Sequence, residues 1–228
     1  IISDADANLN KNRINFSLTQ LLTEVKPSWE IGAPLIQTNT EPSRKTILFL
    51  AANPKNTGRL RLDEEVREIE KGLRRSAKRD SLKLVQKWAV QIPDLRMALL
   101  EEGANIIHFS GHGSSSGRII LEDESGHSKE VPPKAIGNLF SLFSNEGIEC
   151  VLLNACYSES QAQEIAKHIP FVIGMNDAVP DKAAIEFSTA FYDAIGNGKG
   201  IEFAFRLAQI SIELSGISNE NIPVLLKK

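Results

Sequence analysis

Two short apolar runs, each ending abruptly in small and polar residues, constrain the fold of this chain most strongly. Residues 106–109 (IIHF) lead into Ser-Gly-His-Gly at 110–113, and residues 151–153 (VLL) lead into Asn-Ala-Cys at 154–156. An apolar run of this length that is closed by turn-forming residues is typical of a strand buried on both faces of a parallel sheet. Loops at the carboxyl ends of such strands form the sites of open α/β sheets. The sequence therefore predicts one site built from two strand ends.

The side chains that follow the two strands are chemically complementary. His112 lies between Gly111 and Gly113, and Cys156 follows the second strand. A cysteine attacks as the thiolate, so it needs a neighbouring base and donors for the developing oxyanion. The intervening segment is long enough for a right-handed parallel connection, which would place both loops at one edge of the sheet. We therefore predict a nucleophilic pair of His112 and Cys156, with the backbone N–H groups of Gly113 and Cys156 as oxyanion donors.

Each member of this pair also has a plain structural explanation. A free cysteine is commonly a small buried apolar side chain, and a histidine in a glycine-rich loop is commonly a turn residue. Taken alone, Cys156 is explained better by burial, whereas the two explanations of His112 are equally good. Their placement at matching strand ends favours catalysis. The remaining histidines and cysteine are assigned structural roles: a hydrogen-bonded core histidine for His108, packing for Cys150, a hairpin position for His127 and a helix end for His168.

Two other chemistries compete for the same region. The glycine-rich segment 111–117 follows a strand and could cradle a phosphate, as in a nucleotide-binding flavodoxin-like module. It lacks the GxGxxG pattern and the P-loop lysine, and a hairpin rather than a helix is expected after it. A metal site made of His108, His112 and Cys156 does not match the ligand spacing of zinc sites. We therefore expect neither a metal nor an organic cofactor.

From Lys45 onward the chain alternates strand-like runs with helical patterns. Strands are expected at 46–51, 82–90, 106–109, 151–153, 171–175 and 223–226, and helices at 63–79, 93–100, 134–143, 160–168, 181–195 and 201–214. The runs at 82–90 and 223–226 are expected near the sheet edges, and residues 118–122 and 127–131 flank turn-forming residues that predict a small hairpin. Strands that alternate with helices imply right-handed crossovers and a mainly parallel sheet.

Composition excludes several classes of protein. The hydrophobic fraction of 42% and the charged fraction of 24% are ordinary for a soluble globular domain. A formal net charge of −3 gives no overall attraction to nucleic acid or to an anionic membrane. No apolar run reaches the ~18 residues that a membrane span needs, and no signal peptide is visible. Cys150 and Cys156 lie at the two ends of one strand, where they cannot easily bridge, so reduced thiols and a cytoplasmic location are expected.

The first 45 residues differ from the rest. Three prolines lie between Glu24 and Ser43, and apolar residues recur at helical spacing over 16–25. We expect 1–45 to be an N-terminal arm or linker with one short amphipathic helix, and 46–228 to be the functional domain. Because the chain begins with Ile1 rather than methionine, we also expect it to be a piece of a longer protein.

The motifs HFSGHG at 108–113, LLNACYS at 152–158 and IGM at 173–175 resemble those of the caspase-like cysteine peptidases (clan CD), and among them the CHAT domains of bacterial proteins. The resemblance covers about residues 45–228. It implies a caspase-like three-layer α/β sandwich with a mainly parallel central sheet and helices on both faces. It also implies His112, rather than His108, as the general base, Cys156 as the nucleophile, and an oxyanion hole at Gly113 and Cys156.

By the same resemblance the chain is expected to be a cytoplasmic cysteine endopeptidase that cleaves a protein substrate. Such a protein would act in bacterial, including antiviral, defence or in a cell-death-like pathway, under the control of a sensor domain or partner protein. The alternative is a catalytically silent CHAT scaffold that binds signalling partners. Relatives that cleave after arginine or lysine carry an aspartate two positions before the nucleophile, where this chain has Asn154. An apolar or small residue before the cleaved bond is therefore expected at least as much as a basic one, in a pocket (S1) lined by Asn154, Met175 and Asp177.

Overall fold

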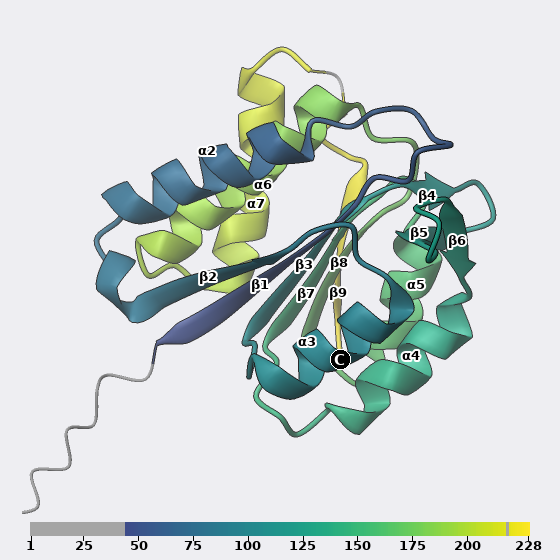
Figure 1. Ribbon diagram of the computed structural model, residues 1–228. Coiled ribbons are helices and arrows are strands. Elements are labelled where there is room, and N and C mark those ends of the chain that lie inside the picture. The colour runs from purple at the N-terminus through teal and green to yellow at the C-terminus, as the bar shows by residue number, and fades with distance from the viewer. Residues whose placement is uncertain (1–43, 218) are drawn as a thin grey trace, which may run out of the picture. The chain divides into compact units, whose positions relative to one another are not determined.

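The computed structural model describes residues 44–217 and 219–228, which belong to one compact unit, Pro42–Lys228 (Figure 1). The helix expected at 16–25, with nearly all of the arm expected at 1–45, lies outside the described residues and stays a prediction. The described strands are β1 (Lys45–Ala52), β2 (Leu82–Lys87), β3 (Ile106–Gly111), β4 (Gly113–Ser114), β5 (Arg118–Glu122), β6 (Ser128–Val131), β7 (Cys150–Asn154), β8 (Phe171–Met175) and β9 (Pro223–Lys227). The described α-helices are α2 (Leu62–Arg75), α3 (Ile92–Glu101), α4 (Pro133–Leu142), α5 (Glu159–Ala166), α6 (Asp181–Gly196) and α7 (Ile201–Leu214).

The main sheet has six strands in the order β2-β1-β3-β7-β8-β9. The first five run parallel to their neighbours, and β9 pairs antiparallel with β8. The sheet is therefore mainly parallel, with β2 and β9 at its edges, as predicted. Every residue of β3 and β7 is buried, because helices cover both faces of a parallel sheet. The two apolar runs that suggested central strands are the central strands.

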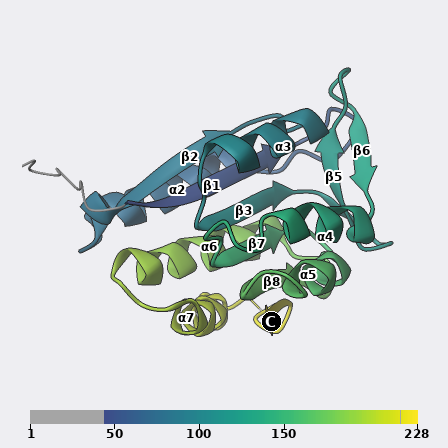
Figure 2. The same cartoon turned by 90° about the horizontal axis from the view of Figure 1, so that it is seen from below.

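Two helical layers sandwich this sheet, which confirms the predicted three-layer architecture (Figure 2). Helices α2, α6 and α7 cover one face, where they pack on alternate strand residues such as Ile47 and Phe49. Helices α3, α4 and α5 cover the other face and pack on the intervening residues, such as Leu48 and Leu50. Each fully buried side chain of this size contributes about 1.5–3 kcal/mol relative to exposure. No helix in the described part of the chain is long and apolar enough to traverse a lipid bilayer.

A second, smaller sheet lies directly after β3. Strands β4, β5 and β6 form it in antiparallel order, and the pair β5–β6 is the hairpin that the turn residues predicted. Ile119 and Leu121 of β5 are buried in the core beneath α3, α4 and α5. The small sheet is thus fixed to the domain, and it holds the chain that leaves His112.

The two predicted elements that differ most from the structure both end early. The strand expected over 82–90 stops at Lys87, because Ala89 adopts a positive φ of 53° and turns the chain. The helix expected over 63–79 stops at Arg75. There the hydroxyl of Ser76 donates to the carbonyl oxygen of Leu73, and the backbone of Ser76 is extended. Both ends depend on local turn geometry that apolar periodicity does not encode.

Candidate active site

The carboxyl ends of β3 and β7 lie side by side. The two strands pair up to Ser110 and Asn154, which are direct partners in the ladder. Beyond them the chain enters the loop of His112 and Gly113 and the turn of Cys156. A Cβ atom built on Gly113 would lie 1.9 Å from the carbonyl oxygen of Cys156 and 3.1 Å from its nitrogen, so the two backbones are in direct contact. The structure therefore brings the predicted histidine and cysteine loops together at one edge of the sheet.

The imidazole of His112 is partly exposed and is anchored by the loop between β1 and α2. Its Nε2 atom lies 2.6 Å from the carbonyl oxygen of Gly58. Because a carbonyl oxygen only accepts hydrogen bonds, Nε2 carries the proton of the neutral ring and Nδ1 is left as an acceptor. The main chain is held as well, since the carbonyl oxygen of His112 accepts the N–H of Ile120 at 3.0 Å. The ring is thus fixed in one tautomer.

Cys156 is partly exposed and lies in a tight turn between β7 and α5. The next residue, Tyr157, has a φ of 55°, in the left-handed region that side chains other than glycine rarely adopt. Such a conformation costs about 1–3 kcal/mol and persists only where its surroundings hold it. The buried hydroxyl of Ser158 holds this turn, since it donates to the carbonyl oxygen of Leu153 at 2.9 Å and accepts the N–H of Met175 at 3.0 Å. The thiol is therefore displayed on a rigid bend at the end of its strand.

The loop after β8 borders the thiol. The carbonyl oxygen of Val179 lies 3.9 Å from Sγ of Cys156. The carbonyl oxygen of Asp177 accepts the N–H of Tyr157 at 3.2 Å. A hydrogen bond with the Asp177 carboxylate also raises the pKa of the Tyr157 hydroxyl. Residues 176–180 therefore form one side of the site.

The three residues predicted to line a substrate pocket are placed differently from one another. Asp177 is exposed in the loop after β8, and Met175 is fully buried. Asn154 has only 3% of its surface exposed. Its amide nitrogen donates to Oε1 of Glu65 at 2.7 Å and to the carbonyl oxygen of Ala184 at 3.3 Å. Asp177 thus faces solvent near the thiol, whereas the amide of Asn154 points into the interior.

Comparison with known proteins identifies the family. A family model described as the CHAT domain matches residues 15–219. The chain belongs to the CHAT domain family. The match begins inside the segment expected to be an arm, and the predicted domain boundary after residue 45 stays a prediction.

The relatives of this CHAT domain include a "Roc-COR-CHAT protease" of an unknown prokaryotic organism, which is 25% identical over 229 residues, 93% of this chain and 21% of the relative. The chain spans about a fifth to a third of the length of the curated relatives it matches. Among solved structures, a secreted C11 cysteine protease from Bacteroides thetaiotaomicron superposes with a TM-score of 0.56 at 12% identity, covering 81% of this chain and 66% of that one. Caspase-1 from Spodoptera frugiperda gives a TM-score of 0.54 at 11% identity, covering 89% and 92%. The fold of the CHAT domain is caspase-like, as the motifs implied.

A buried carboxylate beneath the site was missed by the sequence reasoning. Glu65 was not singled out among the acidic residues at the start of α2, yet it has only 2% of its surface exposed. It lies in the buried stripe of α2 with Leu62 and Ile69. Helical spacing alone places these three residues on one face, and this was the available signal.

The two residues expected to play structural roles near the site are both buried. His108 has no exposed surface, and its Nε2 atom lies 3.2 Å from Oε1 of Glu65. Neither ring nitrogen makes a well-directed hydrogen bond, and the ring stacks on Tyr192. Burial and the nearby Glu149 raise the pKa of the Cys150 thiol. His108 is thus a core histidine as predicted, but without the expected hydrogen bond, and Cys150 packs as predicted.

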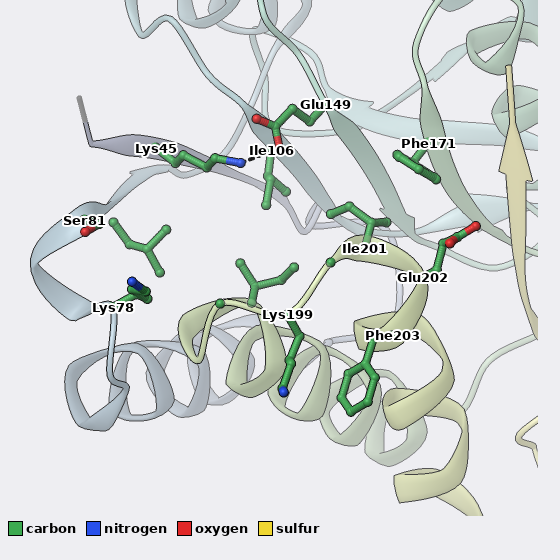
Figure 3. Close-up of a pocket in the computed structure, with 14 residues that line it drawn as sticks. Lys45, Lys78, Ser81, Ile106, Glu149, Phe171, Lys199, Ile201, Glu202 and Phe203 are labelled. Carbon is green, nitrogen blue, oxygen red and sulfur yellow. Dashed lines mark hydrogen bonds and ion pairs between the residues drawn. The ribbon is translucent and has the colours of Figure 1, made fainter. Parts of the chain in front are cut away.

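A cavity of about 690 Å³ lies at the other end of the sheet (Figure 3). Its lining includes Lys45, Ile106 and Phe171 at the amino ends of β1, β3 and β8, and residues 198–203, which lead from α6 into the first turn of α7. Lys45 and Glu149, which both line the cavity, form an ion pair at 2.7 Å. The lining contains neither histidine nor cysteine, and the strands separate this cavity from the predicted catalytic pair.

Proposed function

We propose that this CHAT domain is a cysteine endopeptidase that uses His112 as general base and Cys156 as nucleophile. The observation that carries the proposal is the direct backbone contact of Gly113 with Cys156, which sets the two loops against each other. The caspase-like fold supports it, as do relatives that are named as proteases. No metal or organic cofactor enters the proposed reaction.

The proposed reaction begins with proton transfer from the thiol of Cys156 to Nδ1 of His112. The carbonyl oxygen of Gly58 accepts a hydrogen bond from the Nε2–H group of His112, which leaves Nδ1 free to accept the thiol proton. The thiolate then attacks the scissile carbonyl carbon and forms a tetrahedral oxyanion. As the C–N bond breaks, the imidazolium of His112 returns its proton to the leaving amine, and water later hydrolyses the thioester with His112 as base.

The orientation of Gly113 supports its role as an oxyanion donor. Opposite residues of an antiparallel pair alternate between hydrogen-bonded and non-hydrogen-bonded pairs. The N–H of Ile120 donates to the carbonyl oxygen of His112, so Gly113 and Ile119 form the next, non-hydrogen-bonded pair. The N–H of Gly113 therefore points away from β5. We propose that it binds the oxyanion together with the N–H of Cys156, each donor typically being worth ~10²–10³ in rate.

A protein substrate, a cytoplasmic location and control by a sensor domain or partner are parts of the same proposal. The relative named Roc-COR-CHAT carries further domains by its name, and this chain covers only 21% of it, which supports control from outside the domain. A role in bacterial, including antiviral, defence or in a cell-death-like pathway is proposed on the same ground. The exposed Asp177 is proposed as a substrate contact in the S1 pocket, with Asn154 and Met175 behind it.

Alkylation by iodoacetamide at neutral pH tests the pair directly and requires no substrate. Cys156 is partly exposed, whereas Cys150 is fully buried with a raised pKa and serves as an internal control. We expect selective labelling of Cys156, slowed by roughly 10-fold or more in His112→Ala because the base is lost. An equal rate in wild type and His112→Ala would contradict the pairing.

Cleavage of a peptide library tests the activity itself. Wild type is expected to cleave, and Cys156→Ala is expected to lose all cleavage because no other thiol reaches the surface among the described residues. Cys150→Ala is the matched control and is expected to cleave like wild type. Residual cleavage by Cys156→Ala would exclude it as the nucleophile, and a wild type that binds partners without cleaving would indicate the silent scaffold instead.

A further inference from the structure

One buried carboxylate joins the ends of the two strands that lead into the proposed catalytic loops. Oε1 of Glu65 accepts hydrogen bonds from the amide nitrogen of Asn154 at 2.7 Å and from the hydroxyl of Ser188 at 2.6 Å. Its other oxygen, Oε2, accepts from the hydroxyl of Ser110. Nε2 of His108 lies 3.2 Å from Oε1. A single side chain on α2 thus contacts β3, β7 and α6 together.

The positions of these donors relate them to the proposed pair. Ser110 lies two residues before His112, and Asn154 lies two residues before Cys156. Ser110 and Asn154 are also direct partners in the parallel ladder of β3 and β7. Glu65 therefore bonds to both strands at the last rung before the chain turns into the two loops.

A charged carboxylate is costly in this position unless it is paired or hydrogen-bonded. Every other buried residue of α2 is apolar, and an isolated ionised carboxylate is strongly disfavoured in the interior. Burial by itself raises the pKa of Glu65, but the neighbouring His108 and the hydroxyls of Ser110 and Ser188 outweigh it, so the net pKa is lowered. The surrounding donors are arranged for a charged acceptor.

We propose that Glu65 is a positioning residue of this peptidase, whose carboxylate ties Ser110 to Asn154 and thereby fixes the separation of His112 and Cys156. This inference rests on the proposed function of the pair. Among the described residues, Glu65 makes no hydrogen bond to the thiol of Cys156 or to the imidazole of His112, so it acts through the two strand ends. Misplacement of reacting groups by about 1 Å costs on the order of 10² in rate, which sets the size of the expected effect.

The test compares two substitutions of Glu65 that differ in hydrogen bonding. Glu65→Leu keeps the apolar stripe of α2 but removes both acceptor oxygens. Glu65→Gln keeps an oxygen for Asn154 and Ser188 and offers an amide to the oxygen of Ser110, since a hydroxyl both donates and accepts. We expect kcat of Glu65→Leu to fall by roughly 30-fold or more with KM within about threefold, and Glu65→Gln to restore kcat to within about fivefold of wild type.

A matched control separates positioning from loss of stability. Ile69 lies on the same buried stripe of α2, four residues after Glu65, and has no exposed surface. Ile69→Ala opens a cavity and is expected to lower Tm at least as much as Glu65→Leu, while kcat measured well below Tm stays within about twofold of wild type. Equal losses of kcat in Ile69→Ala and Glu65→Leu would overturn the inference, and so would a glutamine variant as impaired as the leucine variant.

The outcomes also distinguish this inference from the proposed function. If wild type neither cleaves peptides nor alkylates at Cys156 faster than His112→Ala does, the proposed function fails, and the positioning role fails with it. If wild type cleaves and Glu65→Leu cleaves at the same kcat, the function stands and only the positioning role is overturned. Non-additive losses of kcat in Glu65→Leu, Ser110→Ala and the double variant would support the tie through Ser110.

Discussion

Strand β7 begins at one cysteine and is followed two residues after its end by another, and the two cysteines have different surroundings. Cys150, at the amino end, is fully buried among apolar side chains, and burial raises the pKa of its thiol. Cys156, beyond the carboxyl end, is partly exposed on a strained turn against the loop of His112. The same functional group is thus suited to packing at one end of the strand and to nucleophilic attack at the other. The two thiols differ because Cys150 lies within the covered sheet, whereas Cys156 lies in the turn where the chain leaves it.

The same contrast holds for the whole sheet. The amino end carries a cavity of about 690 Å³ with an exposed ion pair, but no histidine or cysteine lines it. The carboxyl end carries backbone contacts that are too close to admit a single Cβ atom. The cavity at the amino end therefore does not mark the proposed chemistry. Close main-chain approach and a buried hydrogen-bonded carboxylate mark it instead.

The largest expected effect comes from a methyl group placed at the carboxyl end. Gly113→Ala would force the Cβ atom into the backbone of Cys156, so the two loops must separate. We expect peptidase activity to fall by ~100-fold or more, because reacting groups that move by about 1 Å lose on this order in rate. Gly200→Ala at the amino end is the matched control, since nothing lies within 4 Å of its added Cβ. Similar activities of the two variants would contradict the assignment of catalysis to the carboxyl end of the sheet.

A second carboxylate at the carboxyl end is expected to have the next largest effect. Asn154→Asp would place a carboxylate beside that of Glu65, where the amide nitrogen now lies 2.7 Å from Oε1. One of the two groups must then take up a proton, so its folded pKa is raised above the unfolded value. The resulting loss of stability, about 3 kcal/mol at pH 8, shrinks as the pH falls towards 5.

Urea unfolding at the two pH values measures this difference. Asn138→Asp, at an exposed position of α4, is the control and is expected to change stability by less than about 0.5 kcal/mol at either pH. A pH-independent loss in Asn154→Asp would argue against a charged Glu65.

The buried cysteine predicts an alkaline loss of stability. The pKa of Cys150 is raised from the ordinary value of 9.0, so the native state holds its proton more tightly than the unfolded chain does. The stability from this group is complete below about pH 9 and is lost above it, by up to ~1.4 kcal/mol per pH unit. Between pH 8 and 10.5 the free energy of unfolding should therefore fall less steeply with pH in Cys150→Ala than in wild type, as measured by denaturant unfolding at several pH values. An unchanged slope in the variant would show that other groups, such as the buried Tyr192, set the alkaline limit.

The smallest effect is expected from the ion pair at the amino end. The side chains of Lys45 and Glu149 are 52% and 42% exposed, so water and salt screen their attraction. Lys45→Ala should lower stability by less than about 1 kcal/mol and leave peptidase activity unchanged. Denaturant unfolding and a peptide assay check both expectations. A loss of activity in this variant would connect the amino end to catalysis.

Much of the fold followed from the sequence because its central strands are unusually clear. The runs ending at Phe109 and Leu153 are apolar except for His108, which is how strands covered on both faces appear. A parallel connection between these strands also placed the histidine and cysteine loops together, because the carboxyl ends of parallel strands lie at the same edge of a sheet. The elements that came out too long, at 63–79 and 82–90, end at turns held by Ser76 and Ala89, and single-residue geometry of this kind leaves no periodic pattern.

The finer structure of the site was less accessible to sequence reasoning. Glu65 was not singled out, because it is one of three consecutive acids at a helix start, where the dipole favours negative charge at each position. Only tertiary packing distinguishes the one that faces the sheet. The carbonyl of Gly58 was also missed, because a backbone acceptor in a loop has no signature in the side chains. Asn154 was predicted to line the S1 pocket, and this stays a prediction; its interior orientation depends on Glu65, which the sequence did not reveal.

The close approach of Gly113 to Cys156 has an implication for how such a domain can diversify. The spacing of the proposed reacting groups is set there by main-chain atoms, which are the same whatever side chains surround them. On the proposed function, the segment 176–180 borders the substrate, so selectivity for new targets can be changed there while the spacing of the reacting groups is kept. Engineering of this scaffold should begin with that segment and leave the glycine untouched.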